Sequence, residues 1–463
     1  MIQQNKLQAK WNDELAKQRL AEAQIDFLNN LQVPYMLNYY DRIYKEPIKL
    51  ARTHDYCRTL NLSEQLVGKL AIAFKNGLDY NLTTNGGDNP EQEEERKQDL
   101  IDICNKAQLL PTLSEADEYV TMNNYAAISA VWDYSTGEVR LDLIPRSTCF
   151  VTQDVFNPKR ITAFYYQIGI TEDSPQRPDS ICEYMKITAD SYDTVTVDHS
   201  NGSEVLHETT PNPYGVITVV GLFSELQVNS YFPDKKSLIM DFNIDVNTEL
   251  TNYALTHTMQ SHSILVITGD TGSKLSATQV TAIKVNPYPE SDKADVKYVT
   301  PGADLAKLLK TINDKCLMYA NMLGISASVY SNTQAGNTTA FEIAMSVSGI
   351  TEKINERLPF YSRAVNTLVN LIAQIYSYHN STATFDRYSI NVEINQHKIE
   401  PSRAEILDNY SKELALGLVS KVEILMKERK MSREDAEELY ATIKADEQVG
   451  VVEAFPNLTD DEE

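Results

Sequence analysis

The sequence predicts an α+β protein, mainly helical, in which a mixed N-terminal block precedes several long helices. Two observations predict this class. Between about residues 126 and 220, apolar and polar residues alternate, which is the period of strands with one buried face. In the second half, apolar residues recur at steps of three and four over long stretches, which is the period of amphipathic helices. The length of 463 residues suits about two to four structural units.

The charge of the chain restricts its partners. It has 65 acidic and 42 basic residues, a net charge of −23. A protein that grips DNA phosphates is usually basic, because Lys and Arg displace counterions from the duplex. This chain either never meets nucleic acid or meets DNA without holding it. The N-terminus is polar, so we expect no signal peptide, and the longest apolar run, 215–223, is too short to cross a bilayer. We therefore expect no membrane partner.

Motifs for catalysis and cofactor binding are missing from the sequence. No P-loop, GxGxxG or HExxH pattern occurs, and the seven histidines are scattered. The five cysteines form no CxxC pair, and we interpret them as reduced thiols. The sequence thus predicts no catalytic residue, no metal and no cofactor.

Helices and then strands are predicted in the N-terminal block. Helical patterns cover residues 4–30, 61–76 and 91–108, and a loop is expected at 81–90, which contains Asn-Gly-Gly. Strands are expected at 127–134, 138–144, 160–170, 181–187, 192–198 and 204–209, and a buried strand within 215–223. The pair Asn201-Gly202 favours a tight hairpin, since both residues tolerate positive φ.

Two long helices with a small insert between them are predicted in the centre. Residues 234–262 carry an apolar stripe from Ile239 to Tyr253, and a second stripe runs from Leu305 to Leu323 after Pro301-Gly302. The insert is expected to contain a strand at 264–268, a short helix at 277–284 and a strand at 295–300. This order predicts an antiparallel helical pair with a small knob at its far end.

The last part of the chain begins with a segment of small polar residues, 324–337, which we interpret as a mobile loop. Thr339 and Glu342 form a capping-box pattern that opens a very long helix to about residue 380, with an expected kink at Pro359. Residues 388–394 alternate as a late strand that returns to the N-terminal block. Residues 401–463 are expected to be helical, with capping boxes starting at Ser402, Ser420 and Ser432 and a stop at Gly417.

The order of these elements resembles the portal proteins of tailed bacteriophages, especially the shorter SPP1-like type, from about residue 30 to 445. Three stretches carry the resemblance: 212–220 followed by Glu225, 261–269, and Gly324 through Thr338-Thr-Ala-Phe-Glu342. The chain departs from the family at Ala335-Gly336-Asn337, where a Gly-Ser-type turn is usual, so the exact limits of the loop stay open.

The resemblance implies a portal fold with an α/β wing (1–233 and the returning strand in 381–400), two stem helices (234–262 and 302–323), a small β-containing clip (263–301), a tunnel loop (324–337), a long kinked helix (338–380) and a helical crown (401–463). It implies a non-enzymatic homo-oligomeric ring, most often of 12 subunits, at one capsid vertex of the virion, assembled in the host cytoplasm. Such a ring passes double-stranded DNA during packaging and ejection. Its expected partners are the terminase, a head-completion adaptor, and the major capsid and scaffolding proteins.

Two groups of residues are the expected contacts with DNA. Asn243, Asp245, Asn247 and Glu249 share the polar face of the first stem helix and are expected to line the channel, where acidic groups would repel phosphates. The loop residues expected nearest to DNA are Ser328, Tyr330, Ser331, Asn332, Thr333, Gln334 and Asn337. The alternatives are a solvated outer helix face and an ordinary surface loop.

Two other functions remain open from the sequence. Asp179, Glu183 and Lys186 weakly match the acidic and basic residues of a metal-dependent nuclease, although the ExxK spacing differs from ExK. Another oligomeric head-neck structural protein, without direct DNA contact, would also fit the predicted fold.

Overall fold

The computed structural model describes residues 2–45, 51, 53–84, 90–154, 156–157, 159–170, 181–199, 202–225, 230–233, 237–261, 264–268, 282–285, 295–299, 304–327, 340–380, 385–395, 410–417, 419–429, 433 and 435–442. The chain divides into two compact units. The first comprises 1–333 and 346–397, and the second comprises 334–345 and 398–463. Each unit is described by itself.

The N-terminal part of the first unit is helical with one strand. Its elements are α1 (Ile2–Leu28), α2 (Val33–Ile43), α4 (Leu62–Leu70), β1 (Leu78–Thr84), α5 (Pro90–Lys106) and α6 (Leu109–Asn123). The predicted helices at 4–30 and 91–108 are confirmed. The helix predicted at 61–76 was wrong after residue 70, because α4 ends at Leu70 and residues 73–76 form a turn. Asn61 caps α4, because its side chain accepts a hydrogen bond from the Glu64 N–H at 3.2 Å. The loop expected from residue 81 was wrong as far as residue 84, which belongs to β1, and α6 was not predicted.

Two antiparallel sheets follow. The strands are β2 (Tyr125–Asp133), β3 (Glu138–Pro145), β4 (Cys149–Gln153), β5 (Ile161–Ile170), β6 (Ile181–Ile187), β7 (Ser191–Asp198), β8 (Ser203–Pro211) and β9 (Val219–Phe223). They form a three-stranded sheet of order β3-β2-β9 and a five-stranded sheet of order β4-β5-β6-β7-β8. Gly137 and Gly202 adopt positive φ in the β2–β3 and β7–β8 turns, and the hairpin predicted at Gly202 is confirmed.

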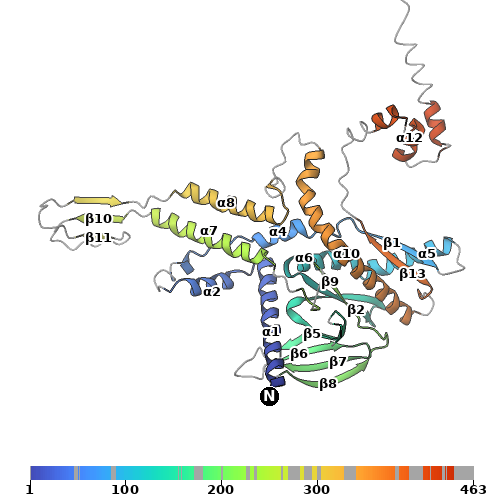
Figure 1. Ribbon diagram of the computed structural model, residues 1–463, viewed down its shortest axis with the longest axis horizontal. Coiled ribbons are helices and arrows are strands. Elements are labelled where there is room, and N and C mark those ends of the chain that lie inside the picture. Colours follow the sequence, from blue (N-terminus) through green and yellow to red (C-terminus); the bar gives the residue numbers. More distant parts are fainter. Residues whose placement is uncertain are drawn as a thin grey trace, which may run out of the picture. The chain divides into compact units, whose positions relative to one another are not determined.

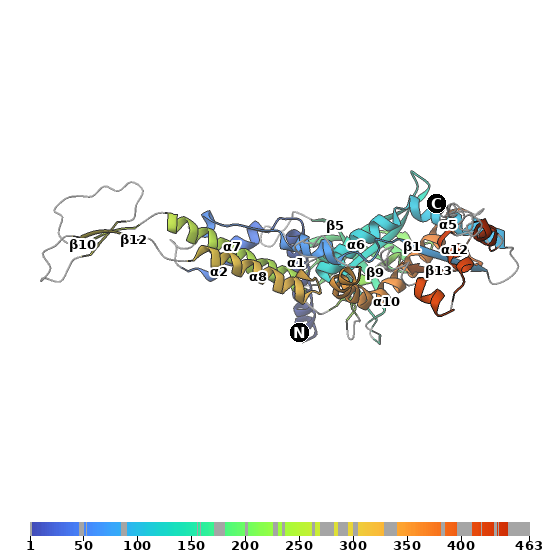
Figure 2. The same ribbon diagram turned by 90° about the horizontal axis from the view of Figure 1, so that it is seen from above.

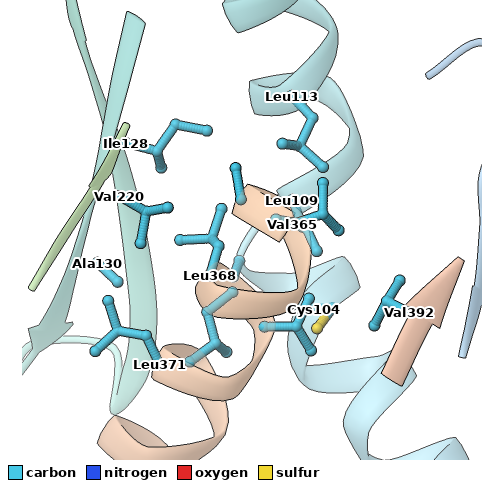
Figure 3. Close-up of a cluster of buried hydrophobic side chains, with 14 of the residues drawn as sticks. Cys104, Leu109, Leu113, Ile128, Ala130, Val220, Val365, Leu368, Leu371 and Val392 are labelled. Atoms are coloured by element: carbon cyan, nitrogen blue, oxygen red, sulfur yellow. The ribbon is translucent and has the colours of Figure 1, made fainter. Parts of the chain in front are cut away.

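A long helix and a returning strand complete the main core. Helix α10 (Ala340–His379) continues through Pro359, and β13 (Tyr388–Ile394) pairs antiparallel with β1, from Leu78 opposite Ile394 to Thr84 opposite Tyr388. This confirms the predicted return of the chain to the N-terminal block. Leu368 and Leu371 of α10 lie among side chains from the β2–β9 sheet and from α5 and α6 (Figure 3).

The two predicted central helices are α7 (Ile239–Ser261) and α8 (Leu305–Met322), and they lie side by side (Figures 1 and 2). Between them in the chain come β10 (Ile264–Thr268), β11 (Ala282–Val285) and β12 (Asp295–Val299), in a sheet of order β11-β10-β12. The short helix expected at 277–284 was wrong where it can be checked, because Ala282–Val285 pairs parallel with β10. Backbone pairing with a distant strand here outweighs local helical preference.

The described part of the second unit is helical. It contains α12 (Lys421–Arg429) and helical residues at 410–415 and 435–442. The capping box at Ser420 is confirmed: Ser420 Oγ accepts from the Glu423 N–H at 3.2 Å, and Glu423 Oε2 accepts from the Ser420 N–H at 2.8 Å. Gly417 has φ of 69°, as a helix stop requires. The boxes at Thr339, Ser402 and Ser432 start at residues outside the described part.

Candidate functional site

The contact between α7 and α8 is the centre of the candidate site. Their facing side chains form one apolar cluster with the N-terminal helices. Ile312, Cys316 and Ala320 of α8 are buried in it, and the rings of Phe242 and Tyr319 stack with centroids 4.1 Å apart. Burial of this shared apolar face holds the two helices together, since separating them would expose it to water.

A polar cluster at the edge of this contact links the helices by charge. Lys315 Nζ lies 3.1 Å from Asp245 Oδ2 and 2.9 Å from Glu249 Oε1, and the Tyr319 hydroxyl donates a hydrogen bond to Asp245. Burial, followed by the hydrogen bond to Asp245, raises the pKa of Tyr319 to about 12. Two carboxylates thus share one ammonium in this cluster.

The opposite face of α7 is buried against the N-terminal helices. The side-chain amide of Asn243 lies within hydrogen-bond distance of Gln32 (3.0 Å), Ser63 (2.9 Å) and Asn247 (2.7 Å). Asn247 Oδ1 also accepts from the Leu60 N–H at 2.7 Å. Asn243 and Asn247 are both 0% exposed, so the expectation that they line a channel was wrong. Their amides instead satisfy the backbone and side-chain groups that α7 buries.

Thr251, one helical turn further, continues this buried contact. Its hydroxyl accepts from the Tyr40 hydroxyl at 2.9 Å and from the Arg58 N–H at 3.1 Å. Burial raises the pKa of Tyr40 to about 12. Helix α7 therefore packs against α8 on one side and against α2 and the segment around residues 57–63 on another, which leaves the edge with Asp245 and Glu249 facing outward.

Asp245 and Glu249 are the expected channel residues that reach the surface. Their side chains are 41% and 36% exposed, whereas that of Lys315 between them is 27% exposed. The structure brings these two carboxylates together, as their spacing of four residues on one helix predicts. Lys315 and Tyr319 could not be identified as partners from the sequence, because the residue pattern of α8 does not indicate which acidic groups will face them.

The base of the expected tunnel loop is a close crossing of two backbones. Gly324, just after α8, has φ of 83°, and a Cβ there would lie 2.7 Å from the carbonyl oxygen of Gly349 on α10. Ile325 and Ile350, the residues that follow these two glycines, are both buried. The residues expected nearest to DNA, Ser328, Tyr330, Ser331, Asn332, Thr333, Gln334 and Asn337, lie outside the described part.

Helix α10 is anchored about two to three turns after this crossing by a buried carboxylate. Asp117 of α6 accepts hydrogen bonds from the Tyr361 hydroxyl at 2.7 Å and from the Ala73 N–H at 3.0 Å, and the Arg357 guanidinium lies 3.8 Å away. Burial raises the pKa of Asp117. The Arg357 guanidinium also donates to Thr121 Oγ1 at 2.7 Å, so this part of α10 is fixed to α6 by polar contacts as well as by the core.

The weak nuclease pattern is not assembled into a site. Asp179 lies outside the described residues, while Glu183 and Lys186 are three residues apart on β6 and so point to opposite faces of the sheet. Lys186 instead contacts Glu204 of β8 at 2.7 Å. In the described ranges, no three His, Cys, Asp or Glu side chains are grouped to hold a metal, and no helix is long and apolar enough to cross a membrane. None of the five cysteines forms a disulfide.

Comparison with known proteins gives the family. The model of the family described as "Phage portal protein, SPP1 Gp6-like" matches residues 165–449, which is more than half of the chain. The chain belongs to the phage portal protein family. The matched part of this portal protein runs from β5 through α7, β10–β12, α8, α10 and β13 to α12.

Two solved structures of gene transfer agent (GTA) particles resemble this portal protein. The neck of an empty GTA particle, computed with C6 symmetry, gives a TM-score of 0.41 at 11% identity, covering 81% of this chain and 91% of that chain. The virion of a native GTA particle gives 0.38 at 10% identity, covering 82% of this chain and 92% of that chain. No curated protein matches the sequence.

Proposed function

We propose that this portal protein forms a homo-oligomeric ring, with 12 subunits in the virion, at one vertex of a capsid. Double-stranded DNA would pass through its central opening during packaging and ejection. The observation that carries the proposal is membership of the portal family over residues 165–449, a range that includes the α7–α8 pair and the β10–β12 sheet between them. In this assignment α7 and α8 are the stem, β10–β12 the clip, and the residues after 401 the crown.

The net charge of −23 supports a channel rather than a DNA-holding protein. Duplex DNA carries one negative charge per about 1.7 Å of its axis, and cationic side chains bind these phosphates by releasing counterions. A cationic wall would therefore retain each phosphate in turn and slow sliding. Acidic groups at the wall would keep the duplex in its hydration layer.

The first test is direct imaging of the purified full-length protein by negative-stain electron microscopy over a range of salt and protein concentrations. Rings with a central opening wide enough for a duplex, about 20 Å, are expected. A particle that stays monomeric, or that lacks an opening, under all these conditions would contradict the proposal.

Asp245 and Glu249 are the proposed channel-lining residues, because they are the exposed members of the expected group. Replacing both with Lys should leave rings visible by microscopy but slow packaging of DNA into proheads. The matched control is Glu208→Lys, which makes the same kind of charge reversal on the exposed strand β8. If rings of the Asp245→Lys/Glu249→Lys variant packaged DNA at the wild-type rate, this edge of the stem would not line the channel.

Residues 324–337 are proposed as the loop nearest to DNA. Deleting 329–336 should leave ring assembly intact and impair packaging or retention of DNA in the filled particle. A normal yield of filled virions from the deletion variant would reject this role.

The terminase, a head-completion adaptor and the major capsid and scaffolding proteins are the proposed partners, with assembly in the host cytoplasm. ATP hydrolysis would belong to the terminase motor, and the portal protein itself would act as a non-enzymatic structural protein. Another head-neck role without DNA contact would be favoured if the protein formed rings that neither bound terminase nor supported packaging.

A further inference from the structure

The turn between β4 and β5 presents an aromatic ring and two cations to solvent. Phe156 is 97% exposed, which is unusual for a large apolar side chain in a folded turn. Lys159 and Arg160 are exposed beside it, and in the described part of the chain neither forms an ion pair. Two backbone hydrogen bonds join described residues of this turn: the Asp154 N–H donates to the Arg160 carbonyl at 2.8 Å, and the Arg160 N–H donates to the Asn157 carbonyl at 2.9 Å.

An acidic hollow of about 420 Å³ lies elsewhere in the same unit, between α5, the β2–β3 turn and the end of α10. The carboxylates of Asp99, Asp102 and Glu138 line it, and two cations lie beside them: Lys106 is 3.5 Å from Glu138, and Arg96 is 3.0 Å from Asp99. The three carboxylates still outnumber the two cations. Ile103 and Tyr376 supply apolar surface within it. A segment with cations and an aromatic ring therefore complements both the carboxylates and the apolar surface of this hollow.

The turn and the hollow belong to different sides of the subunit. Lys159 lines a cavity together with Arg363 and Thr367 of α10, whereas Tyr376 of α10 lines the acidic hollow. Thirteen residues separate Arg363 from Tyr376, which in an α-helix corresponds to about 20 Å along the axis and a rotation of about 220°. The two surfaces thus lie on roughly opposite sides of α10, as a head-to-tail contact between copies requires.

We infer that the β4–β5 turn of one subunit docks into the acidic hollow of the next, with Phe156 against Ile103 and Tyr376 and with Lys159 and Arg160 near the carboxylates. The occupant is a second copy of this chain, because the contact pairs unequal, complementary surfaces of the same molecule. The inference rests on the proposed ring and goes further by assigning two surfaces that join its subunits.

A charge-swap experiment on the full-length protein tests this contact. The turn variant is Lys159→Glu/Arg160→Glu, and the hollow variant is Asp102→Lys/Glu138→Lys. The control is Lys75→Glu, which reverses an exposed cation outside both surfaces. Circular dichroism and thermal unfolding first establish that each variant is folded, and native mass spectrometry with negative-stain microscopy then measures the fraction of protein in rings.

The turn variant alone and the hollow variant alone should each lose at least tenfold in ring fraction at low salt, while the control should assemble like the wild type. An equimolar mixture of the two variants should recover rings in which they alternate, because each reversed turn then meets a reversed hollow. Wild-type levels of rings from either variant alone, or no recovery in the mixture, would overturn the inference. If the wild type itself forms no ring, the proposed function fails instead, so the two failures are distinguishable.

Discussion

The crossing of Gly324 and Gly349 gives a stability prediction that separates two physical causes. Gly324→Ala should be destabilising because φ of 83° is left-handed and because the new Cβ would lie 2.7 Å from the Gly349 carbonyl oxygen. The left-handed conformation costs a non-glycine residue about 1–2 kcal/mol. Forcing a methyl group into filled space costs about 1–3 kcal/mol more. The sum predicts that the free energy of unfolding falls by about 2–5 kcal/mol.

Two other glycines provide matched controls. Gly137 has φ of 71°, and a Cβ added there would meet no atom within 4 Å, so Gly137→Ala carries the conformational cost alone, about 1–2 kcal/mol. Gly68 lies exposed in helix α4, also with nothing within 4 Å, so Gly68→Ala should stabilise the protein by about 0.5–1 kcal/mol. The difference between the Gly324 and Gly137 variants isolates the cost of the close approach.

Urea unfolding, followed by far-ultraviolet circular dichroism at a fixed low protein concentration, ranks these variants by the midpoint of the transition that reports the first unit. The expected order of stability is Gly68→Ala, wild type, Gly137→Ala, Gly324→Ala. If Gly324→Ala were no less stable than Gly137→Ala, the backbone crossing at the base of the loop would be looser than the structure indicates.

Three further predictions concern buried or shared charges. Asp117→Ala should lower the free energy of unfolding by about 3–5 kcal/mol, because it leaves the Tyr361 hydroxyl and the Ala73 N–H without their acceptor and removes the carboxylate beside the Arg357 guanidinium. Asp117→Asn should cost less, and urea midpoints compare the two variants. Burial lowers the pKa of His199 below its usual 6.5, so the unfolded chain binds a proton at this residue more readily than the folded chain. The free energy of unfolding should therefore fall as the pH drops below about 6.5, by at most about 1.4 kcal/mol per pH unit. His199→Asn should flatten a plot of melting temperature against pH, and an unchanged slope would contradict the role given to His199. Lys315→Met should cost about 1 kcal/mol or less at low salt, because its ion pairs are partly exposed, and equal losses at low and high salt would show that charge is not the cause.

Local signals in the sequence were sufficient for many elements of the fold. The apolar stripes of α7 and α8, the hairpin at Gly202 and the capping box at Ser420 each depend on residues within one or two turns of each other. Such signals depend only on residues close together in the chain, so they can be recognised in the sequence without knowledge of tertiary contacts. The same logic explains why the order of elements, together with three local stretches, indicated the portal family.

Side-chain environments needed the tertiary structure. Asn243 and Asn247 were expected on one polar face with Asp245 and Glu249, yet residues two apart on a helix lie about 200° apart. The first two are fully buried, and the last two reach solvent. Gln32 lies 211 residues before Asn243, and Leu60 lies 187 residues before Asn247. Both approach α7 from one side only, and no local pattern specifies which side of the helix they cover. Polar residues on a helix mark either a solvated face or a buried hydrogen-bond network, and only the position of the partner elements distinguishes the two.

The sequence by itself thus determined most of the helices and strands, their order, and the acidic charge of the chain. Only the tertiary structure decided that β11 is a strand, that Lys315 joins two carboxylates, and that Gly324 crosses Gly349. The physical reason is that the first set depends on periodicity and charge within the chain, whereas the second depends on contacts between residues that are distant in sequence.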